Sequence, residues 1–468
     1  MEEEVIENRE EQEEEPPTEK KPQDAEDEDW ESHLEKHLDK NLDKQSTMSK
    51  GEKEYLSPRK VNPPEGGVRV IAEEETNVHG LKVQKKLEIV RKRKERLKMK
   101  IILIYTGLHK KVYWTNLPKN GTKGFLSRTG CPETKCHITY DKNLMPIADA
   151  VIFHERDMPS LGLVRSLSRL AKRPLSQRWV YFTSETPKNS VVSSIPYNGF
   201  FNWTMTYKVK SDIFLPYGQY RKMAENERPP PVVNYAKTKN ATIAWLVGNC
   251  NFLFRMKFVK LLSRATKVSV GGSCRDGFPD KLPCTRWCDS STLKNYKFYL
   301  AFENGICTDY ITEKYWRYLE MGLVPVVLGG ADYGDPRLAI PNSYIDASKF
   351  KSVKELANYL DYLDKNDTAY NEYFAWKQTY KLLSFGGWPF ESYSMCNICK
   401  KLFAKESRKV YYKLSDFWSI DHDCEEPEDK LTKRFIPKDF DKGEIDPEKA
   451  ARLKNSKENI PKDFDEEF

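Results

Sequence analysis

The chain has 468 residues, of which 12% are aromatic, and a formal net charge of +7 at pH 7. This length is sufficient for two ordinary domains plus tails. A small positive excess over so long a chain does not require a nucleic-acid partner. The basic stretch 82–100 has few aromatic residues and no recognisable nucleic-acid-binding motif, so no such partner is predicted.

Both ends of the chain are polar and poor in apolar periodicity. Residues 1–98 are predicted to form a disordered stem, acidic over 1–32 and basic over 82–100, with a solvated basic helix over 81–98. Residues 426–468 are predicted to form a disordered tail. This tail contains Ile-Pro-Lys-Asp-Phe-Asp twice, at 436–441 and 460–465. The repeat is either part of that tail or a pair of docking motifs.

Short apolar runs, separated by polar or helical stretches, predict an α/β fold with buried, largely parallel sheets. Three consecutive prolines, Pro229–Pro231, lie in the segment 225–240 and indicate a boundary between two α/β domains. The expected helices are 252–264, 311–321 and 353–363. The expected strands are 101–106, 150–154, 179–183, 242–247, 267–270, 298–302 and 324–328.

Ten cysteines and four Asn-x-Ser/Thr sequons favour an oxidising, secretory compartment. Cys396 and Cys399 have the spacing of half a zinc site, but a structural site needs four ligands and no second such pair or nearby histidine is present. Disulfides are therefore the favoured interpretation. The sequon asparagines, which we predict to be N-glycosylated, are Asn120, Asn202, Asn240 and Asn366.

No apolar stretch is long enough to span a bilayer, because the longest run near the front is 101–104 and about 20 residues are needed. The acidic N-terminus is also unlike a signal peptide. Both observations conflict with a luminal protein, and the sequence does not resolve the conflict.

The most informative segment runs from Tyr296 to Gly330. A strand ends in Glu303-Asn304-Gly305, and after a loop Thr312 is a plausible N-cap for a helix that begins with Glu313 and Lys314. Amide N–H groups and a lysine at a helix N-terminus favour a bound pyrophosphate. The segment therefore predicts a nucleotide-diphosphate site, unless these residues serve only the helix start and the solvated surface.

The sequence of this segment closely resembles the donor-binding signature of the α1,3-fucosyltransferase family, glycosyltransferase family 10. It looks most like that of invertebrate members. The resemblance rests on FYLAFEN, four further residues, DYITEK and then VPVVLGG. ADAVIFHERD (148–157) and RWVYFTSETP (178–187) resemble the family's N-terminal domain. The similarity covers about Lys100 to Cys424.

The resemblance implies a GT-B fold, in which two Rossmann-like domains face a central cleft. The acceptor-side domain would comprise 99–232, and 233–425 would bind GDP-fucose and carry a closing C-terminal helix. The implied reaction is inverting transfer of L-fucose from GDP-β-L-fucose, in α1,3 linkage, to N-acetylglucosamine of an N-glycan core or of N-acetyllactosamine. The family is expected in the Golgi lumen on a membrane anchor, which this sequence does not show.

The resemblance also assigns site residues. Glu185, in Glu-Thr-Pro where the family has Glu-Ser-Pro, would be the catalytic base, although it could be an exposed loop residue. Arg255 and Lys314 would stabilise the leaving diphosphate. The other donor-binding candidates are Tyr299, Asn304, Tyr310 and Glu313, and a core role is equally open for Tyr299.

Neither a metal nor another cofactor is required by this interpretation, although a divalent cation could stimulate the reaction, and no Asp-x-Asp sits at a strand end. Cys396 and Cys399 match a family cysteine cluster and, with Cys424 and an N-terminal cysteine from Cys131 and Cys136, would tie the last helix to the first domain. Two alternatives stay open: a GT-B transferase with another donor, and a non-catalytic GDP-sugar or glycan-binding relative.

Overall fold

The computed structural model describes residues 67–440, except for 109, 111–113, 115–116, 118–124, 171–172, 286–287, 384–389, 405, 426–430 and 439. The chain divides into two units, Met1–Lys86 and Leu87–Phe468, and every strand of the described part belongs to the second unit. None of the helices in the described part is both long and apolar enough to cross a bilayer.

The first half of this second unit is built on a six-stranded, wholly parallel sheet in the order β2-β1-β3-β4-β5-β6. Apolar runs such as AVIFH in β3 are buried on both faces, as expected for a parallel sheet covered by helices. The strands are β1 (Lys100–Ile104), β2 (Cys136–Thr139), β3 (Ala150–His154), β4 (Arg178–Phe182), β5 (Trp203–Thr206) and β6 (Ile213–Phe214).

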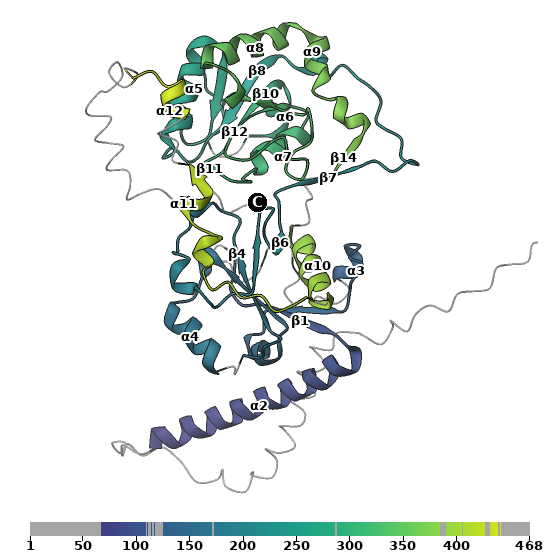
Figure 1. The fold of residues 1–468 in the computed structure, drawn as a ribbon, viewed down its shortest axis with the longest axis vertical. Helices are drawn as coiled ribbons and strands as arrows, with labels where there is room; N and C mark the ends of the chain where they lie inside the picture. The colour runs from purple at the N-terminus through teal and green to yellow at the C-terminus, as the bar shows by residue number, and fades with distance from the viewer. Residues whose placement is uncertain are drawn as a thin grey trace, which may run out of the picture. The chain divides into compact units, whose positions relative to one another are not determined.

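Helices from distant parts of the chain cover this sheet. Alongside α3 (Phe125–Arg128) lies α10 (Phe390–Phe403), which also contacts β1 and β6 (Figure 1). Disulfides Cys131–Cys396 and Cys136–Cys399 link α10 to the segment around β2. Helix α4 (Leu161–Leu170) also belongs to this half.

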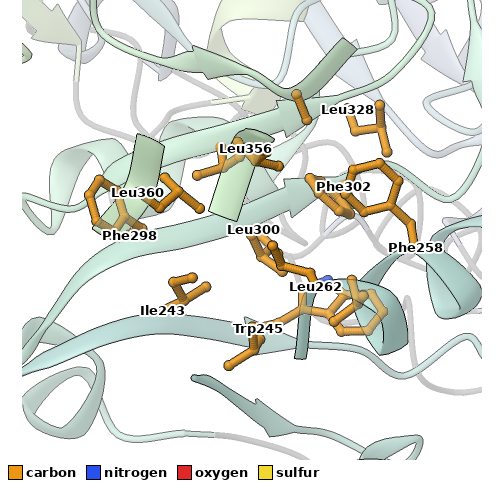
Figure 2. Packing of buried hydrophobic residues seen from close by; sticks show 14 of the residues in the cluster. Ile243, Trp245, Phe258, Leu262, Phe298, Leu300, Phe302, Leu328, Leu356 and Leu360 are labelled. Atoms are coloured by element: carbon orange, nitrogen blue, oxygen red, sulfur yellow. The ribbon is translucent and has the colours of Figure 1, made fainter. Parts of the chain in front are cut away.

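The second half contains a five-stranded parallel sheet in the order β13-β12-β10-β8-β9. Side chains along β10 alternate between the two faces of the sheet, and each face is covered by a different pair of helices. Phe298, Leu300 and Phe302 pack on one face with α5 and α8, whereas Tyr299 and Ala301 pack on the other with α6 and α7 (Figure 2). The elements are β8 (Ala241–Leu246), α5 (Leu253–Ala265), β9 (Val268–Gly271), α6 (Ser290–Lys294), β10 (Tyr296–Phe302), α7 (Glu313–Glu320), β12 (Val324–Leu328), β13 (Ile345–Asp346), α8 (Val353–Lys365) and α9 (Asp367–Glu372).

Two small antiparallel sheets complete the fold, one pairing β7 with β14 and the other β11 with β15. Their strands are β7 (Gln219–Lys222), β14 (Tyr380–Leu383), β11 (Ile306–Cys307) and β15 (Cys424–Glu425), and the short helix α11 (Ile420–Asp423) precedes β15. The seven strands and three helices expected from the sequence are present, with ends shifted by at most two residues.

Parts of the expected stem and of the expected tail are ordered where the structure describes them. Helix α2 (Gly67–Leu97) includes the helix expected over 81–98 but begins earlier in the expected stem. Near its end Val90 is buried and Lys94 forms an ion pair with Asp149, so this helix is not solvated on all sides. In the expected tail, α12 (Leu431–Phe435) is followed by Ile436 and Phe440. These apolar groups explain the difference, because Phe435, Ile436 and Phe440 are buried in the core of the second half.

Ile436 and Phe440 of the first hexapeptide therefore dock on their own chain. Residues 439 and 441 of that copy, the whole second copy, 460–465, and residues 1–66 lie outside the described residues.

The structure separates the sequons by accessibility. Asn202 is only 1% exposed, its amide donates to the Lys409 carbonyl (2.7 Å) and its oxygen accepts from the Trp179 N–H (3.0 Å). A glycan would need that amide nitrogen, and the fold already uses it in a buried hydrogen bond, so glycosylation of Asn202 stays a prediction that this position does not favour. Asn240 is exposed, Asn366 caps α9 and is partly buried, and Asn120 lies outside the described residues.

Candidate active site

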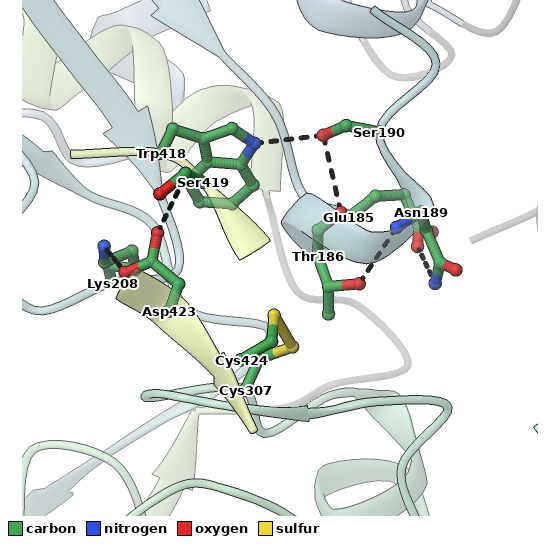
Figure 3. Close-up of a disulfide and its surroundings, with 10 residues drawn as sticks. All are labelled: Glu185, Thr186, Asn189, Ser190, Lys208, Cys307, Trp418, Ser419, Asp423 and Cys424. Carbon is green, nitrogen blue, oxygen red and sulfur yellow. Dashed lines mark hydrogen bonds and ion pairs between the residues drawn. A yellow bond between two sulfur atoms is a disulfide. The ribbon is translucent and has the colours of Figure 1, made fainter. Parts of the chain in front are cut away.

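Glu185 lies just beyond the carboxyl end of β4, where Pro187 begins a short 3₁₀ turn capped by Thr186. It is 6% exposed, and the Asn189 side-chain amide donates to its Oε2 at 3.2 Å (Figure 3). This burial rules out the alternative of a solvent-exposed loop glutamate. A carboxylate held in this way at a strand end is suited to accept a proton from a bound hydroxyl.

A half-buried tyrosine, Tyr217, contacts the Glu185 loop and two buried tyrosines lie close to it. The Tyr217 hydroxyl donates to the Ser184 carbonyl at 2.6 Å, and the Tyr310 ring lies 4.8 Å from that of Tyr207 and 6.2 Å from that of Tyr217. Burial, and then the charge of Glu185, raises the pKa of both Tyr217 and Tyr310 well above the ordinary value. Both phenols therefore stay protonated and remain hydrogen-bond donors at neutral pH.

Arg255 joins the carboxyl ends of two neighbouring strands. Its Nη1 donates to the Phe302 carbonyl at the end of β10 (3.0 Å), and its Nη2 donates to the Asn249 carbonyl beyond β8 (2.8 Å). Chain connectivity reverses direction between β8 and β10, and ligands of open α/β sheets bind outside such a switch point. The predicted diphosphate partner is thus at the expected edge of the second sheet.

Lys314 lies in the first turn of α7, beside the same edge. Its ammonium is 2.7 Å from Glu313 Oε1, 3.0 Å from Thr312 Oγ1 and 3.4 Å from Glu303 Oε2. Burial alone would lower the pKa of Lys314, but the charges of Glu303 and Glu313 outweigh it and raise the pKa. The ammonium therefore remains charged, and the positive charge of Arg255 acts on it in the opposite sense.

Asn304 and Tyr299 differ in what they offer a ligand. Asn304 is 7% exposed, and its buried Oδ1 has no hydrogen-bond partner among the described residues. Tyr299 is buried with its ring stacked on Tyr318, and its hydroxyl lies next to the backbone of Leu246. The core alternative therefore fits Tyr299, whereas Asn304 offers an acceptor for a donor hydroxyl.

The loop between β10 and α7, residues 303–312, meets the Glu185 loop directly. A Cβ atom on Gly305 would lie 3.6 Å from Thr186 Cγ2, and Asp309 Oδ2 accepts from the Val209 N–H at 3.0 Å. Asp309 also has a positive φ of 61°, in the left-handed region that few residues other than glycine adopt. The predicted base and the predicted donor loop are thus neighbours.

Sequence reasoning missed a segment that runs across this junction. We call residues 409–425 the C-terminal strap. The Trp418 indole donates to Ser190 Oγ at 3.0 Å (Figure 3). The Trp418 carbonyl accepts from Ser194 Oγ at 2.8 Å. Further along the strap, Asp423 forms a buried ion pair with Lys208. These partners are some 200 residues apart in the chain, so no local pattern could indicate them.

All five predicted disulfide cysteines are bonded, but Cys424 does not pair with the first half. It bonds to Cys307 in β11, one of the four residues between FYLAFEN and DYITEK in the donor motif, because β15 pairs with β11. The other two bonds are Cys250–Cys274 and Cys284–Cys288. In the part of the chain that the structure describes, no three His, Cys, Asp or Glu side chains are grouped as a metal site would require.

Comparison with known proteins agrees with this geometry. Residues 236–418 match the family model described as glycosyltransferase family 10 (fucosyltransferase) C-term, and 97–218 match fucosyltransferase, N-terminal. The chain is 40% identical over 277 residues to the 3-galactosyl-N-acetylglucosaminide 4-alpha-L-fucosyltransferase FUT3 of Pongo pygmaeus, covering 58% of this chain and 70% of that one. It is 39% identical over 278 residues to the human 4-galactosyl-N-acetylglucosaminide 3-alpha-L-fucosyltransferase FUT6, covering 58% and 72%.

Among solved structures, an alpha1,3-fucosyltransferase matches with a TM-score of 0.42 at 17% identity, covering 66% of this chain and 91% of that one. The same enzyme type with GDP-fucose matches with a TM-score of 0.40 at 16% identity, covering 66% and 92%. The two family models lie in order along the two sheets, and the curated relatives are matched over more than two thirds of their length. Two parallel sheets covered by helices give this chain an α/β fold, and the chain belongs to glycosyltransferase family 10, the fucosyltransferase family.

Proposed function

We propose that this protein transfers L-fucose from GDP-β-L-fucose, with inversion, in α1,3 linkage to N-acetylglucosamine of a glycan. The observation that carries the proposal is the juxtaposition of Glu185 with the donor loop. A buried carboxylate at one strand end lies against a loop whose far end holds Lys314, with Arg255 at the adjacent switch point. Base and cations are thus supplied from opposite sheets.

In this mechanism Glu185 accepts the proton of the attacking acceptor hydroxyl as the new bond to the fucose anomeric carbon forms. The bond from that carbon to the diphosphate oxygen breaks on the opposite side, and GDP leaves. A positioned base contributes about 10²–10⁴-fold. Lys314 and Arg255 stabilise the negative charge that develops on the leaving diphosphate.

The donor is held by groups with hydrogen-bonding capacity to spare. Asn304 Oδ1 would accept from a hydroxyl of the donor, which supplies the partner that this buried atom lacks within the described residues. Tyr310 would donate its protonated phenol, and Glu313 would accept from ribose or fucose hydroxyls. Tyr299 would support this site from behind through its stack on Tyr318.

The proposal also includes the metal requirement of the reaction and the compartment in which the protein acts. With Lys314 and Arg255 at the diphosphate, transfer would need no metal ion, so chelation by EDTA should leave it largely intact. Five disulfides favour an oxidising compartment, and we propose the Golgi lumen as the place of action.

The linkage and acceptor have a second candidate, because the relatives' names include both 3-alpha- and 4-alpha-fucosyltransferases. The decisive experiment uses the full chain from a secretory host with GDP-fucose and three acceptors: core N-glycan, N-acetyllactosamine and its β1,3-linked isomer. Product linkage is read by NMR. The Glu185→Gln variant and the exposed control Glu372→Gln, on α9, are assayed in parallel.

We expect transfer by the wild type and the control, and none by Glu185→Gln, which should still bind GDP. Transfer only to the β1,3-linked isomer would instead establish the 4-linked reaction. A folded wild type that binds GDP-fucose but modifies no acceptor would overturn the enzymatic proposal in favour of a binding protein. Full activity of Glu185→Gln would remove this residue as the base.

A further inference from the structure

We propose that Glu303 is a positioning residue for Lys314 and acts through the hydroxyl of Thr312, a role that rests on the proposed function. Glu303 directly follows β10, and its side chain is fully buried. Its carboxylate accepts from the Thr312 backbone N–H at 2.8 Å and from Thr312 Oγ1 at 2.9 and 3.0 Å. It thus holds the residue that caps α7.

The direction of these hydrogen bonds determines what Lys314 meets. A threonine hydroxyl has one proton and two lone pairs. When that proton is donated to the Glu303 carboxylate, the hydroxyl oxygen can only accept from other groups. It accepts from the Lys314 backbone N–H (3.4 Å) and from Lys314 Nζ (3.0 Å). Glu303 therefore fixes Thr312 as an acceptor aimed at the ammonium.

The location of Glu303 is fixed independently of Lys314. The Glu303 N–H donates to the Leu328 carbonyl at 3.0 Å, and a Cβ on Gly329 would lie 3.4 Å from Glu303 Cγ. The strand register pairs Phe302 with Leu328. Glu303 and Gly329, which follow these two residues, therefore lie at the same edge of the sheet. A carboxylate buried at such a place is expensive unless it is hydrogen-bonded and paired. The Thr312 bonds and the nearby ammonium meet that requirement.

Glu303 and Glu313 both lie near the Lys314 ammonium, but they differ in exposure. Glu313 makes the closer contact, at 2.7 Å, but is partly exposed, whereas Glu303 lies behind Thr312, out of reach of solvent. A diphosphate can therefore replace Glu313 as the ammonium's partner while Glu303 and Thr312 keep their hold on it from behind. This arrangement presents a charged, oriented donor group before the substrate arrives.

The test is a double-mutant cycle on GDP binding, measured by calorimetry with the full chain. Glu303→Gln supplies an amide that can donate to Thr312 Oγ1 and reverse the hydrogen bond, and Thr312→Val removes the hydroxyl at constant shape. Each should weaken GDP binding by about 10-fold or more, as for loss of a charged hydrogen bond. Thr312→Ser should recover most of the Thr312→Val loss, and thermal melting checks the folding of each variant.

Lys314→Ala provides the background that separates positioning from general structure. In that background Glu303→Gln and Thr312→Val should change GDP affinity by less than about twofold, because the group that they position is gone. Equal losses with and without Lys314 would overturn the proposal, as would Thr312→Val binding like the wild type. Because the readout is GDP binding, absence of fucose transfer would sink the proposed function without affecting this result.

Discussion

Cys307 is disulfide-bonded to Cys424, so the loop that carries the donor motif is tied covalently to the C-terminal strap. The same strap contacts the turn after Glu185 through Trp418 and Ser190. The C-terminal strap therefore contacts both the loop that carries Glu185 and the donor loop. The two bonded cysteines lie 117 residues apart in the chain, so the bond closes a long loop.

Replacing this disulfide by the double variant Cys307→Ser/Cys424→Ser should lower the free energy of unfolding by about 2–4 kcal/mol. It should also weaken GDP binding, since the donor loop loses its tie. Urea denaturation and calorimetry measure the two effects. The control is Cys284→Ser/Cys288→Ser, whose cysteines are only 4 positions apart in the chain, so that its loss should cost less. A larger loss from the control would contradict this explanation.

The ion pair between Lys208 and Asp423 is the buried anchor of the strap. Both side chains are less than 10% exposed, and Lys208 Nζ also donates to the Phe417 carbonyl at 2.6 Å. Lys208→Met or Asp423→Asn alone should cost about 3–5 kcal/mol, because each leaves an uncompensated buried charge.

The Lys208→Met/Asp423→Asn double variant should cost less than the sum of the two single variants, since no charge is then left unpaired. Chemical denaturation of all four proteins gives the coupling energy. Additive losses would show that the two groups do not depend on one another.

The exposure of each sequon asparagine predicts whether it carries a glycan, which the sequons alone do not. Asn240→Gln should remove one glycan from the secreted protein, because Asn240 is exposed. Asn202→Gln should leave the glycan mass unchanged and lower the melting temperature, because its amide groups bond to Lys409 and Trp179. Intact-mass spectrometry before and after glycosidase treatment measures both. A glycan on Asn202 in folded protein would refute the buried position.

Local patterns in the sequence were sufficient for the strands and for the donor motif. The run Phe298–Phe302 is apolar on both faces, which is typical of a central parallel strand, and the residues after it begin the site. For Tyr299 the strand was expected, but the sequence did not show which face of the sheet its ring occupies. Only the stack on Tyr318 decides that its ring faces α7 and the core.

The remaining features depend on contacts between distant residues. The partner of Cys424 could not be deduced, because ten cysteines allow many pairings and only the pairing of β11 with β15 selects Cys307. Glu303 was visible within the motif, but no sequence pattern indicated its hydrogen bond to Thr312, nine residues later. The polar composition after Glu425 likewise hid the few apolar residues that dock on the core.

Those docked residues predict where the folded chain can be shortened. Removal of everything after Glu425 should expose the core surface covered by Phe435, Ile436 and Phe440 and lower the melting temperature clearly. Burial of each such side chain is worth about 1.5–3 kcal/mol. Removal of only 442–468 retains the first hexapeptide and should cost much less. Similar melting temperatures for the two truncated proteins would contradict the docking of 435–440.

Glu155 provides a pH dependence that is independent of the reaction. It follows β3, is buried, and accepts from the Val192 N–H at 2.8 Å. Burial raises its pKa above the ordinary value, while the backbone bond and Arg156 act against this rise and Asp157 adds to it. The folded state therefore binds this proton more tightly than the unfolded state.

With a raised folded pKa, the contribution of Glu155 to stability is fully present below its unfolded pKa and is lost as pH rises through the folded pKa. Glu155→Gln lacks this loss. The stability of the variant minus that of the wild type should thus increase from about pH 4.5 toward neutrality, by no more than about 1.4 kcal/mol per pH unit. Urea denaturation at several pH values, with Glu372→Gln as the exposed control, measures the difference. A difference that falls with rising pH would mean that the folded pKa of Glu155 is lowered.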